Sequence, residues 1–179
     1  MDAALATAQA MFHDRGYDGV GVAAITEALG IKAPSFYAAF GSKAGLFEQV
    51  LDRYARSSLP VDELLRPGAP VAEAVAALLE AAAHIYAADP RAAGCLVLES
   101  ARAGGEAESV VAAQLFKDRS RDQLRDFVAT HFPDQAEAVA DYAATTMSGL
   151  SAGAREGWSE ARLLGVARLA GSAIKALLG

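Results

Sequence analysis

Apolar residues along the chain recur three and four positions apart, which is the spacing of one face of an α-helix. The pattern holds over residues 5–12 and again over residues 22–29. The first stretch stops at Gly16 and the second at Gly30, and glycine is typical just past the end of a helix. The second helix has only about two turns, so it needs neighbours to be stable.

Two more helices are predicted directly after these. Residues 33–40 begin with Ala-Pro, which suits the first positions of a helix, and they stop at Gly41. Ser42 is a suitable N-cap for the next helix, whose apolar positions repeat with helical period over residues 46–54. Three short helices and one longer one within some fifty residues predict a small N-terminal helical domain, residues 1–55.

The rest of the chain has longer helical patterns. Three prolines between residues 60 and 70 interrupt the helical pattern between the N-terminal domain and the next predicted helix. Asp89-Pro90 and Ser159 are good helix starts. The five helices predicted here are 71–88, 90–103, 106–130, 133–153 and 159–178. The sequence therefore predicts an all-α fold of about nine helices, with a C-terminal helical domain over residues 56–179.

The last two predicted helices carry narrow seams of small and apolar residues, spaced alternately three and four apart. The candidate interface residues in these seams are Val139, Ala143, Leu150, Leu163, Ala167, Ala170 and Ile174. Such seams let helices approach closely. They are equally consistent with a hairpin buried in its own monomer and with a four-helix interface between two copies.

Composition excludes several classes of protein. The chain has 179 residues, of which 53% are hydrophobic, so disorder is ruled out. Its net charge of −6 lacks the basic excess of a non-specific nucleic-acid coat. The single Cys95 excludes an intramolecular disulfide. No apolar stretch reaches the roughly 18 to 20 residues of a membrane span, and the first residues lack a basic signal region, so we expect a cytoplasmic protein without a membrane partner.

The acidity is unevenly distributed. Residues 1–56 hold five basic and six acidic side chains, whereas residues 57–179 hold eleven basic and sixteen acidic ones. Most of the negative charge therefore belongs to the C-terminal domain. If the first domain binds DNA, it must do so through a few well-placed contacts rather than through a broad basic face.

The turn at Gly30 carries the most specific information. A helix-turn-helix needs a short scaffold helix, a tight turn and a second helix whose N-terminal residues enter the major groove. Phe36 and Phe40 lie four apart and can face the core, which leaves Lys32 and Ser35 outward. The Tyr37 hydroxyl and the Lys43 ammonium, near the start of the next helix, are natural partners of phosphate.

These residues resemble the DNA-binding domain of TetR-family transcriptional regulators. The resemblance rests on Phe-x-x-x-Gly-Tyr at 12–17, on Val-x-x-Ile-x-x-x-Leu-Gly-Ile at 22–31, and on Pro-Ser-Phe at 34–36 followed by the variant Tyr-Ala-Ala-Phe-Gly-Ser-Lys at 37–43. It covers residues 1 to about 55. The C-terminal part fits the family's divergent effector-binding domain only in length and in number of helices.

The resemblance implies a homodimer that reads an inverted repeat in double-stranded operator DNA. It further implies a C-terminal pocket for a small-molecule effector, whose identity the sequence does not give. In this family, positions matching Tyr37 and Lys43 touch phosphates. Positions matching Lys32, Ala33, Pro34 and Ser35 lie against base edges or backbone.

Three features depart from the family pattern. Gly21 stands where a Ser or Thr often caps the second helix and binds phosphate, and Lys32 stands where a Ser or Thr often begins the recognition helix. The family commonly has a basic arm before its first helix, and this sequence starts without one. A protein without that arm should bind DNA more weakly.

We expect a transcriptional repressor that a small-molecule effector releases from a palindromic operator. The alternative is a helical small-molecule-binding module with weak or lost DNA binding. An enzyme is not expected, because no nucleophile has a base at a recognisable spacing. The three histidines form no ligand-spaced pair, so neither a metal nor another cofactor is predicted.

A ligand pocket in a helical bundle is mostly apolar with a few polar groups. The candidate effector-binding residues are His84, Tyr86, Cys95, Glu99, Phe116, Tyr142 and Met147. For any single one of them, ordinary core packing is the competing interpretation. Cys95 is either a small buried apolar residue or a redox-sensing thiol.

Overall fold

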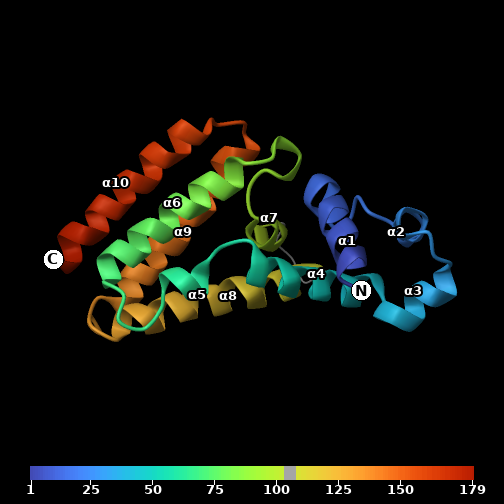
Figure 1. The fold of residues 1–179 in the computed structure, drawn as a ribbon, viewed down its shortest axis with the longest axis horizontal. Coiled ribbons are helices and arrows are strands. Elements are labelled where there is room, and N and C mark those ends of the chain that lie inside the picture. The colour runs from blue at the N-terminus through green and yellow to red at the C-terminus, as the bar shows by residue number, and fades with distance from the viewer. Residues whose placement is uncertain (103–107) are drawn as a thin grey trace. The chain divides into compact units, whose positions relative to one another are not determined.

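A computed structural model describes residues 1–102 and 108–179, and all regular structure in these ranges is helical (Figure 1). The predicted all-α fold is therefore confirmed. The described residues form ten α-helices and a short 3-10 helix, compared with about nine helices predicted. The additional α-helix is α5, which has only four residues, Val61–Leu64, and therefore lacks a periodic signal.

The chain divides into two compact units. The N-terminal unit comprises Met1–Ser57 and Leu96–Phe116, and the C-terminal unit comprises Ser58–Cys95 and Lys117–Gly179. The N-terminal unit contains α1 (Asp2–Arg15), α2 (Val22–Leu29), α3 (Ala33–Phe40), α4 (Lys43–Ser57), α7 (Leu96–Arg102) and the first part of α8 (Glu108–Ala129). The C-terminal unit contains α5, α6 (Val71–Ala87), the 3-10 helix η1 (Pro90–Ala92), the rest of α8, α9 (Ala136–Arg155) and α10 (Glu160–Leu178).

In the N-terminal unit, an aromatic cluster fixes α1 against α4. Phe12 of α1 and Phe47 of α4 are both buried, and their rings meet edge to face with centroids 5.0 Å apart. The core continues through Ile25 of α2 and Phe36 of α3, which are fully buried. Each short helix therefore contributes at least one large side chain to a common core, which compensates for its low stability in isolation.

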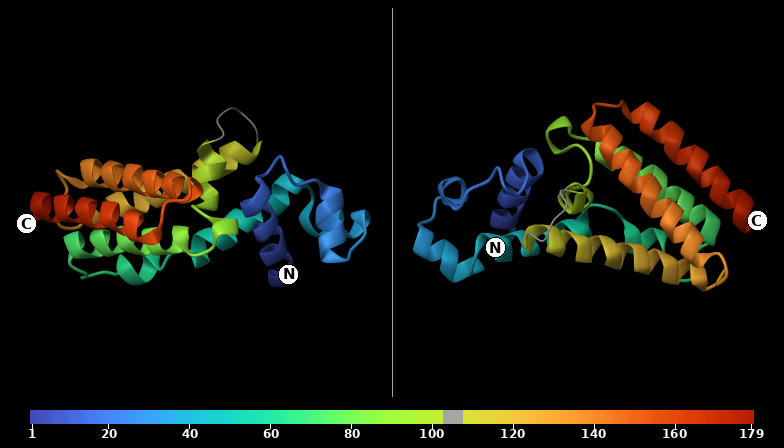
Figure 2. Two further views of the ribbon diagram at one scale, coloured as in Figure 1. Left: turned by 90° about the horizontal axis from the view of Figure 1, so that it is seen from above. Right: turned by 180° about the vertical axis from the view of Figure 1, so that it is seen from behind.

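In the C-terminal unit, α6, α9 and α10 run side by side (Figures 1 and 2). Small residues allow this close packing. A Cβ atom added at Gly171 of α10 would lie 2.8 Å from the Cβ of Ala76 in α6, and one added at Gly153 of α9 would lie 2.9 Å from the Trp158 ring. A larger side chain at Gly171 would therefore force α10 away from α6, and one at Gly153 would displace the Trp158 ring.

The seven candidate interface residues lie inside this three-helix layer. Val139, Ala143 and Leu150 of α9, and all four seam residues of α10, are at most 3% exposed in a single chain. The structure therefore corrects the choice of these residues as a surface for a second copy: within one protomer their side chains are already covered. Of the two interpretations of the seams, the geometry favours packing inside the monomer.

The predicted helix over residues 90–103 is wrong in its first part. Only Pro90–Ala92 is helical, as a 3-10 turn capped by the Asp89 carboxylate, and α7 begins at Leu96. Gly94 has a φ of 79°, and the Cys95 amide donates a hydrogen bond to the Ser151 hydroxyl at 2.9 Å. These features interrupt the helix. The predicted end at residue 103 and the predicted start at residue 106 lie outside the described residues.

Other helix boundaries agree with the prediction to within a few residues. The Ser159 hydroxyl caps α10 by accepting from the Arg162 amide, as its position in the sequence predicts. α9 starts at Ala136 rather than at residue 133, because Pro133–Gln135 form a turn. Among the helices described, none has the length and apolar character needed to cross a membrane.

Candidate nucleic-acid interface

The turn between α2 and α3 has the geometry of a helix-turn-helix. Gly30 ends α2 in the left-handed conformation, with φ 64° and ψ 30°, and its amide donates to the Glu27 carbonyl at 3.1 Å. The Ile31 amide donates to the Thr26 carbonyl at 3.0 Å. These bonds satisfy the last carbonyls of α2 and reverse the chain within two residues, which only glycine does without strain.

α3 has one buried face and one exposed face. Phe36 and Phe40 point into the unit, with exposed fractions of 0% and 7%. The predicted DNA-contacting residues Lys32, Ala33, Pro34, Ser35 and Tyr37 are all exposed. Tyr37 packs its ring edge to face on Phe36 at 5.3 Å and remains 52% exposed. The first turn of α3 is therefore open to a partner, while its aromatic residues hold it to the domain.

Lys43 lies at the start of α4 and is half-buried. The Ser42 hydroxyl accepts a hydrogen bond from the Gly45 amide at 2.9 Å, so the predicted N-cap is confirmed. The Lys43 Nζ atom lies 3.9 Å from the centroid of the Tyr17 ring, a cation–π contact. The ring gives the ammonium an attractive surface without neutralising its charge.

Sequence reasoning missed Tyr17 as part of this site. Gly16, with φ 71°, ends α1 and turns the chain so that the Tyr17 ring stacks on Phe12 and meets Phe47 at 4.9 Å. Burial, followed by the nearby carboxylates of Glu108 and Asp18, raises the pKa of the Tyr17 hydroxyl. The side chain is therefore neutral at physiological pH. The signal available in the sequence was its place directly after a helix-ending glycine.

The basic residues of the first 56 positions differ in whether they are paired. Arg15, Arg53 and Arg56 make ion pairs with Asp14, Asp2 and Asp52 respectively. Among the residues that the structure describes, neither Lys32 nor Lys43 has a carboxylate within ion-pair distance. Residues 28–47 contain these two lysines and no acidic side chain. The α3 region is therefore locally cationic although the domain as a whole is slightly acidic.

The seven candidate effector residues are divided between the two units. Glu99 and Phe116 lie in the N-terminal unit, and the other five lie in the C-terminal unit. There the Gly94 amide donates to the Tyr86 carbonyl at 2.9 Å, which brings Tyr86 close to the buried Cys95. His84 is exposed, and its ring pairs with Glu160 at 2.6 Å. Tyr142 is 45% exposed, and Met147 is partly exposed.

A surface hollow of about 410 Å³ lies elsewhere in the C-terminal unit. Its lining residues are Leu65, Pro67, Gly68, Gln123, Asp126, Phe127, Thr130 and His131. None of the candidate effector residues is among them. Within the described ranges, no group of three or more His, Cys, Asp or Glu side chains could hold a metal ion.

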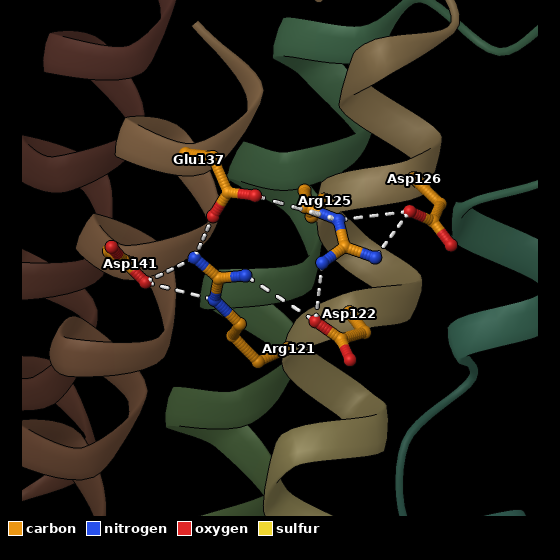
Figure 3. A network of polar contacts seen from close by, with 6 residues as sticks. All are labelled: Arg121, Asp122, Arg125, Asp126, Glu137 and Asp141. Atoms are coloured by element: carbon orange, nitrogen blue, oxygen red, sulfur yellow. Dashed lines mark hydrogen bonds and ion pairs between the residues drawn. The ribbon is translucent and has the colours of Figure 1, made fainter.

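A network of charged residues joins α8 to α9 in the C-terminal unit (Figure 3). Arg121 pairs with Glu137 and with Asp141, the latter at 2.7 Å, and Arg125 bonds to Asp122 at 2.8 Å. Hydrogen bonds to Glu137 and Asp141 raise the pKa of Arg121. These charge pairs therefore link two helices and are not confined to one solvated helix face.

Comparison with known proteins places these features in a family. The sequence model described as bacterial regulatory proteins, tetR family, matches residues 4–50. The HTH-type transcriptional repressor BdcR of Escherichia coli (strain K12) is 42% identical over 176 residues, which cover 98% of this chain and 89% of that protein. The HTH-type transcriptional repressor ComR of the same strain is 30% identical, over 93% of this chain and 84% of ComR.

Solved structures agree with this assignment. A cysteine mutant of the TetR family transcriptional regulator CifR, complexed with 26-bp double-strand operator DNA, is 35% identical to this chain. It superimposes with a TM-score of 0.82, over 96% of this chain and 95% of that one. The chain contains a helix-turn-helix, and BdcR is 42% identical to it over nearly the full length. Together these two findings define one class of protein. The chain belongs to the TetR family of bacterial regulatory proteins.

Proposed function

We propose that this protein is a transcriptional repressor that binds an inverted-repeat operator as a homodimer and is released from it by a small-molecule effector. The observation that carries this proposal is the exposed first turn of α3 in a segment, residues 28–47, that has two lysines and no acidic residue. The BdcR and ComR relatives are repressors, and the CifR structure contains operator DNA.

The proposed DNA-binding domain is residues 1–55, and the proposed effector-binding and dimerisation domain is residues 56–179. In the first, Lys32, Ala33, Pro34 and Ser35 face base edges, while Tyr37 and Lys43 bind phosphates. Backbone amides at the start of α4 add to the attraction for phosphate, because the N-terminus of a helix carries a partial positive charge.

The proposed dimer uses the outer faces of α9 and α10. Each of these faces carries a stripe of exposed, uncharged residues at three- and four-residue spacing. The stripes consist of Ala138, Tyr142, Thr145 and Gly149 on α9, and of Val166, Leu169, Ala173 and Leu177 on α10. Leu169 is 74% exposed in the single chain. An exposed stripe of this kind favours helix packing between two copies.

The effector is proposed to bind within residues 56–179, near Tyr86 and Cys95. Of the sequence-predicted residues in the same unit, His84 and Met147 remain candidates for contact with it, whereas Tyr142 is assigned to the dimer stripe. Release of DNA needs a ligand that binds the free dimer more tightly than the DNA-bound dimer. The difference between these two binding free energies is about 1–3 kcal/mol in typical allosteric proteins. The protein acts without catalysing a reaction, in the cytoplasm where the chromosome lies.

Selection from a random duplex library tests this function. The full chain should enrich a palindrome, and binding of the enriched duplex should show two protomers per duplex by sedimentation. Tyr37→Phe and Lys43→Ala should weaken binding by similar factors on different sequences, because phosphates carry no sequence information. Failure to enrich any duplex, even at low salt, favours the alternative of a ligand-binding module without DNA binding.

A further inference from the structure

The exposed face of α3 is almost entirely apolar. Helical geometry places Pro34 and Ala38, four residues apart, directly opposite the buried pair Phe36 and Phe40. These two side chains therefore form the ridge that would enter a groove most deeply. Neither of them has a hydrogen-bond donor or acceptor.

Few side chains near this ridge can hydrogen-bond to bases. Lys32 and Ser35 are exposed at the start of α3, and Tyr37 lies on its flank. Residues 31–42 contain no Asn, Gln, Arg, Asp or Glu. The pairs that recognise adenine, through Asn or Gln, and cytosine, through Asp or Glu, are therefore absent from this helix. What remains is a lysine, which suits guanine O6 and N7, the hydroxyls of Ser35 and Tyr37, which do not distinguish one base sharply from another, and apolar surface.

Thymine is the base that apolar side chains distinguish. It places a C5-methyl group in the major groove, where alanine and similar groups pack against it. Ala38 and Pro34 offer such a surface on the deepest part of the helix. The small side chains at Ala33, Ala38 and Ala39, all exposed, also let the helix come close to the floor of the groove.

Resting on the proposed function, we propose that this regulator reads its operator largely by apolar contact. Each half-site presents thymine methyl groups to Pro34 and Ala38, next to a guanine that accepts hydrogen bonds from Lys32. The DNA that this protein recognises is therefore thymine-rich at the centre of each half-site. Sequence preference resides in methyl groups more than in polar base edges.

Replacement of thymine by deoxyuridine tests the proposal, because it removes the methyl group and changes no Watson–Crick hydrogen bond. The probe is the palindrome enriched by the unmodified full chain, with uracil placed at one thymine position of both half-sites at a time. Burial of a methyl group corresponds to about a fourfold change in affinity. Since the dimer makes the contact twice, we expect about a fifteenfold loss at one or two positions.

Ala38→Gly and Pro34→Gly provide the matched variants. Each should abolish the difference between thymine and uracil at one position while keeping it at the other, and Ala39→Gly, on the flank, should keep both. The ratio of a variant's affinities for the thymine duplex and the uracil duplex does not depend on what fraction of that variant is folded. The proposal is overturned if no position responds to uracil, or if the response is the same in both variants. Failure to enrich any palindrome would instead refute the proposed function itself.

Discussion

Two sets of charges in this molecule behave in opposite ways. Around α8 and α9, Arg121 and Arg125 are neutralised by four carboxylates that stand on the same two helices (Figure 3). Around α3 and the start of α4, the two lysines have no carboxylate partner among the described residues, and one rests on an aromatic ring. The first arrangement uses charge to join helices, and the second leaves charge available for a partner.

The contrast shows that net charge is a poor guide to nucleic-acid binding. The chain carries −6 overall, and its first 56 residues are slightly acidic. Three of the five cations there are paired with carboxylates of the same unit, so they contribute little to an external field. What distinguishes the α3 region is the absence of acids between residues 28 and 47.

The largest effect is expected from removal of both unpaired lysines. Lys32→Ala combined with Lys43→Ala deletes four cationic contacts per bound dimer, and a hydrogen bond to a charged group contributes about 1.5–3 kcal/mol. We expect at least a hundredfold loss of affinity for the selected duplex, measured by fluorescence anisotropy.

The matched control for this variant combines Arg66→Ala with Arg91→Ala, which removes two exposed cations of the C-terminal unit. It should leave affinity unchanged. Thermal melting should show both proteins folded. Equal losses in the two variants would mean that total charge, rather than its location, determines binding.

A new acid on the cationic segment should be nearly as damaging. Ala38→Glu places a carboxylate on the exposed ridge of α3, where it would face the phosphates and base edges of DNA. We expect binding at least about tenfold weaker than for Ala38→Gln, which has the same size without the charge. Similar DNA affinities for the two variants would contradict the claim that the absence of acidic side chains between residues 28 and 47 is needed for DNA binding.

A smaller effect is expected at Tyr17. Tyr17→Leu removes the ring beneath Lys43, and an exposed cation–π contact contributes about 0.5–1 kcal/mol. DNA binding should weaken about two- to fivefold for each protomer of the bound dimer. Tyr17→Phe, which keeps the ring, should bind like the unmodified protein. In a Lys43→Ala background, Tyr17→Leu should have no further effect, and an additive loss there would show that Tyr17 acts through the fold alone.

The smallest effect on DNA binding is expected from the paired charges. Arg121→Met removes the centre of the α8–α9 network and should leave affinity for the selected duplex within about twofold. At low salt, the Arg121→Met variant should melt at a lower temperature than the unmodified protein. This difference in melting temperature should narrow at high salt, because salt screens exposed ion pairs. A salt-independent difference would contradict an electrostatic role for this network.

Local signals made the first unit largely predictable from sequence. Glycines end α1, α2 and α3, and the Ser42 hydroxyl caps α4, so the predicted bounds of α3 match the structure. The contact between Tyr17 and Lys43 was not predictable, since 26 positions separate the two residues and the intervening helices decide whether they meet.

Long-range contacts also limited prediction in the second unit. The break before α7 depends on Ser151, which is 56 positions away from Cys95. The seams of α9 and α10 were recognised, yet their spacing alone could not tell which partner helix they face. In the structure, α6 is a partner helix of both α9 and α10, and Gly171 of α10 lies close to Ala76 of α6.

The dependence of DNA affinity on salt concentration tests the central claim most directly. Each phosphate contact contributes about 0.9 to the slope of log K against log salt concentration. If Lys43 of each protomer binds one phosphate, Lys43→Ala should lower that slope by about two for the dimer, while Arg91→Ala leaves it unchanged. An unchanged slope in Lys43→Ala would contradict the account.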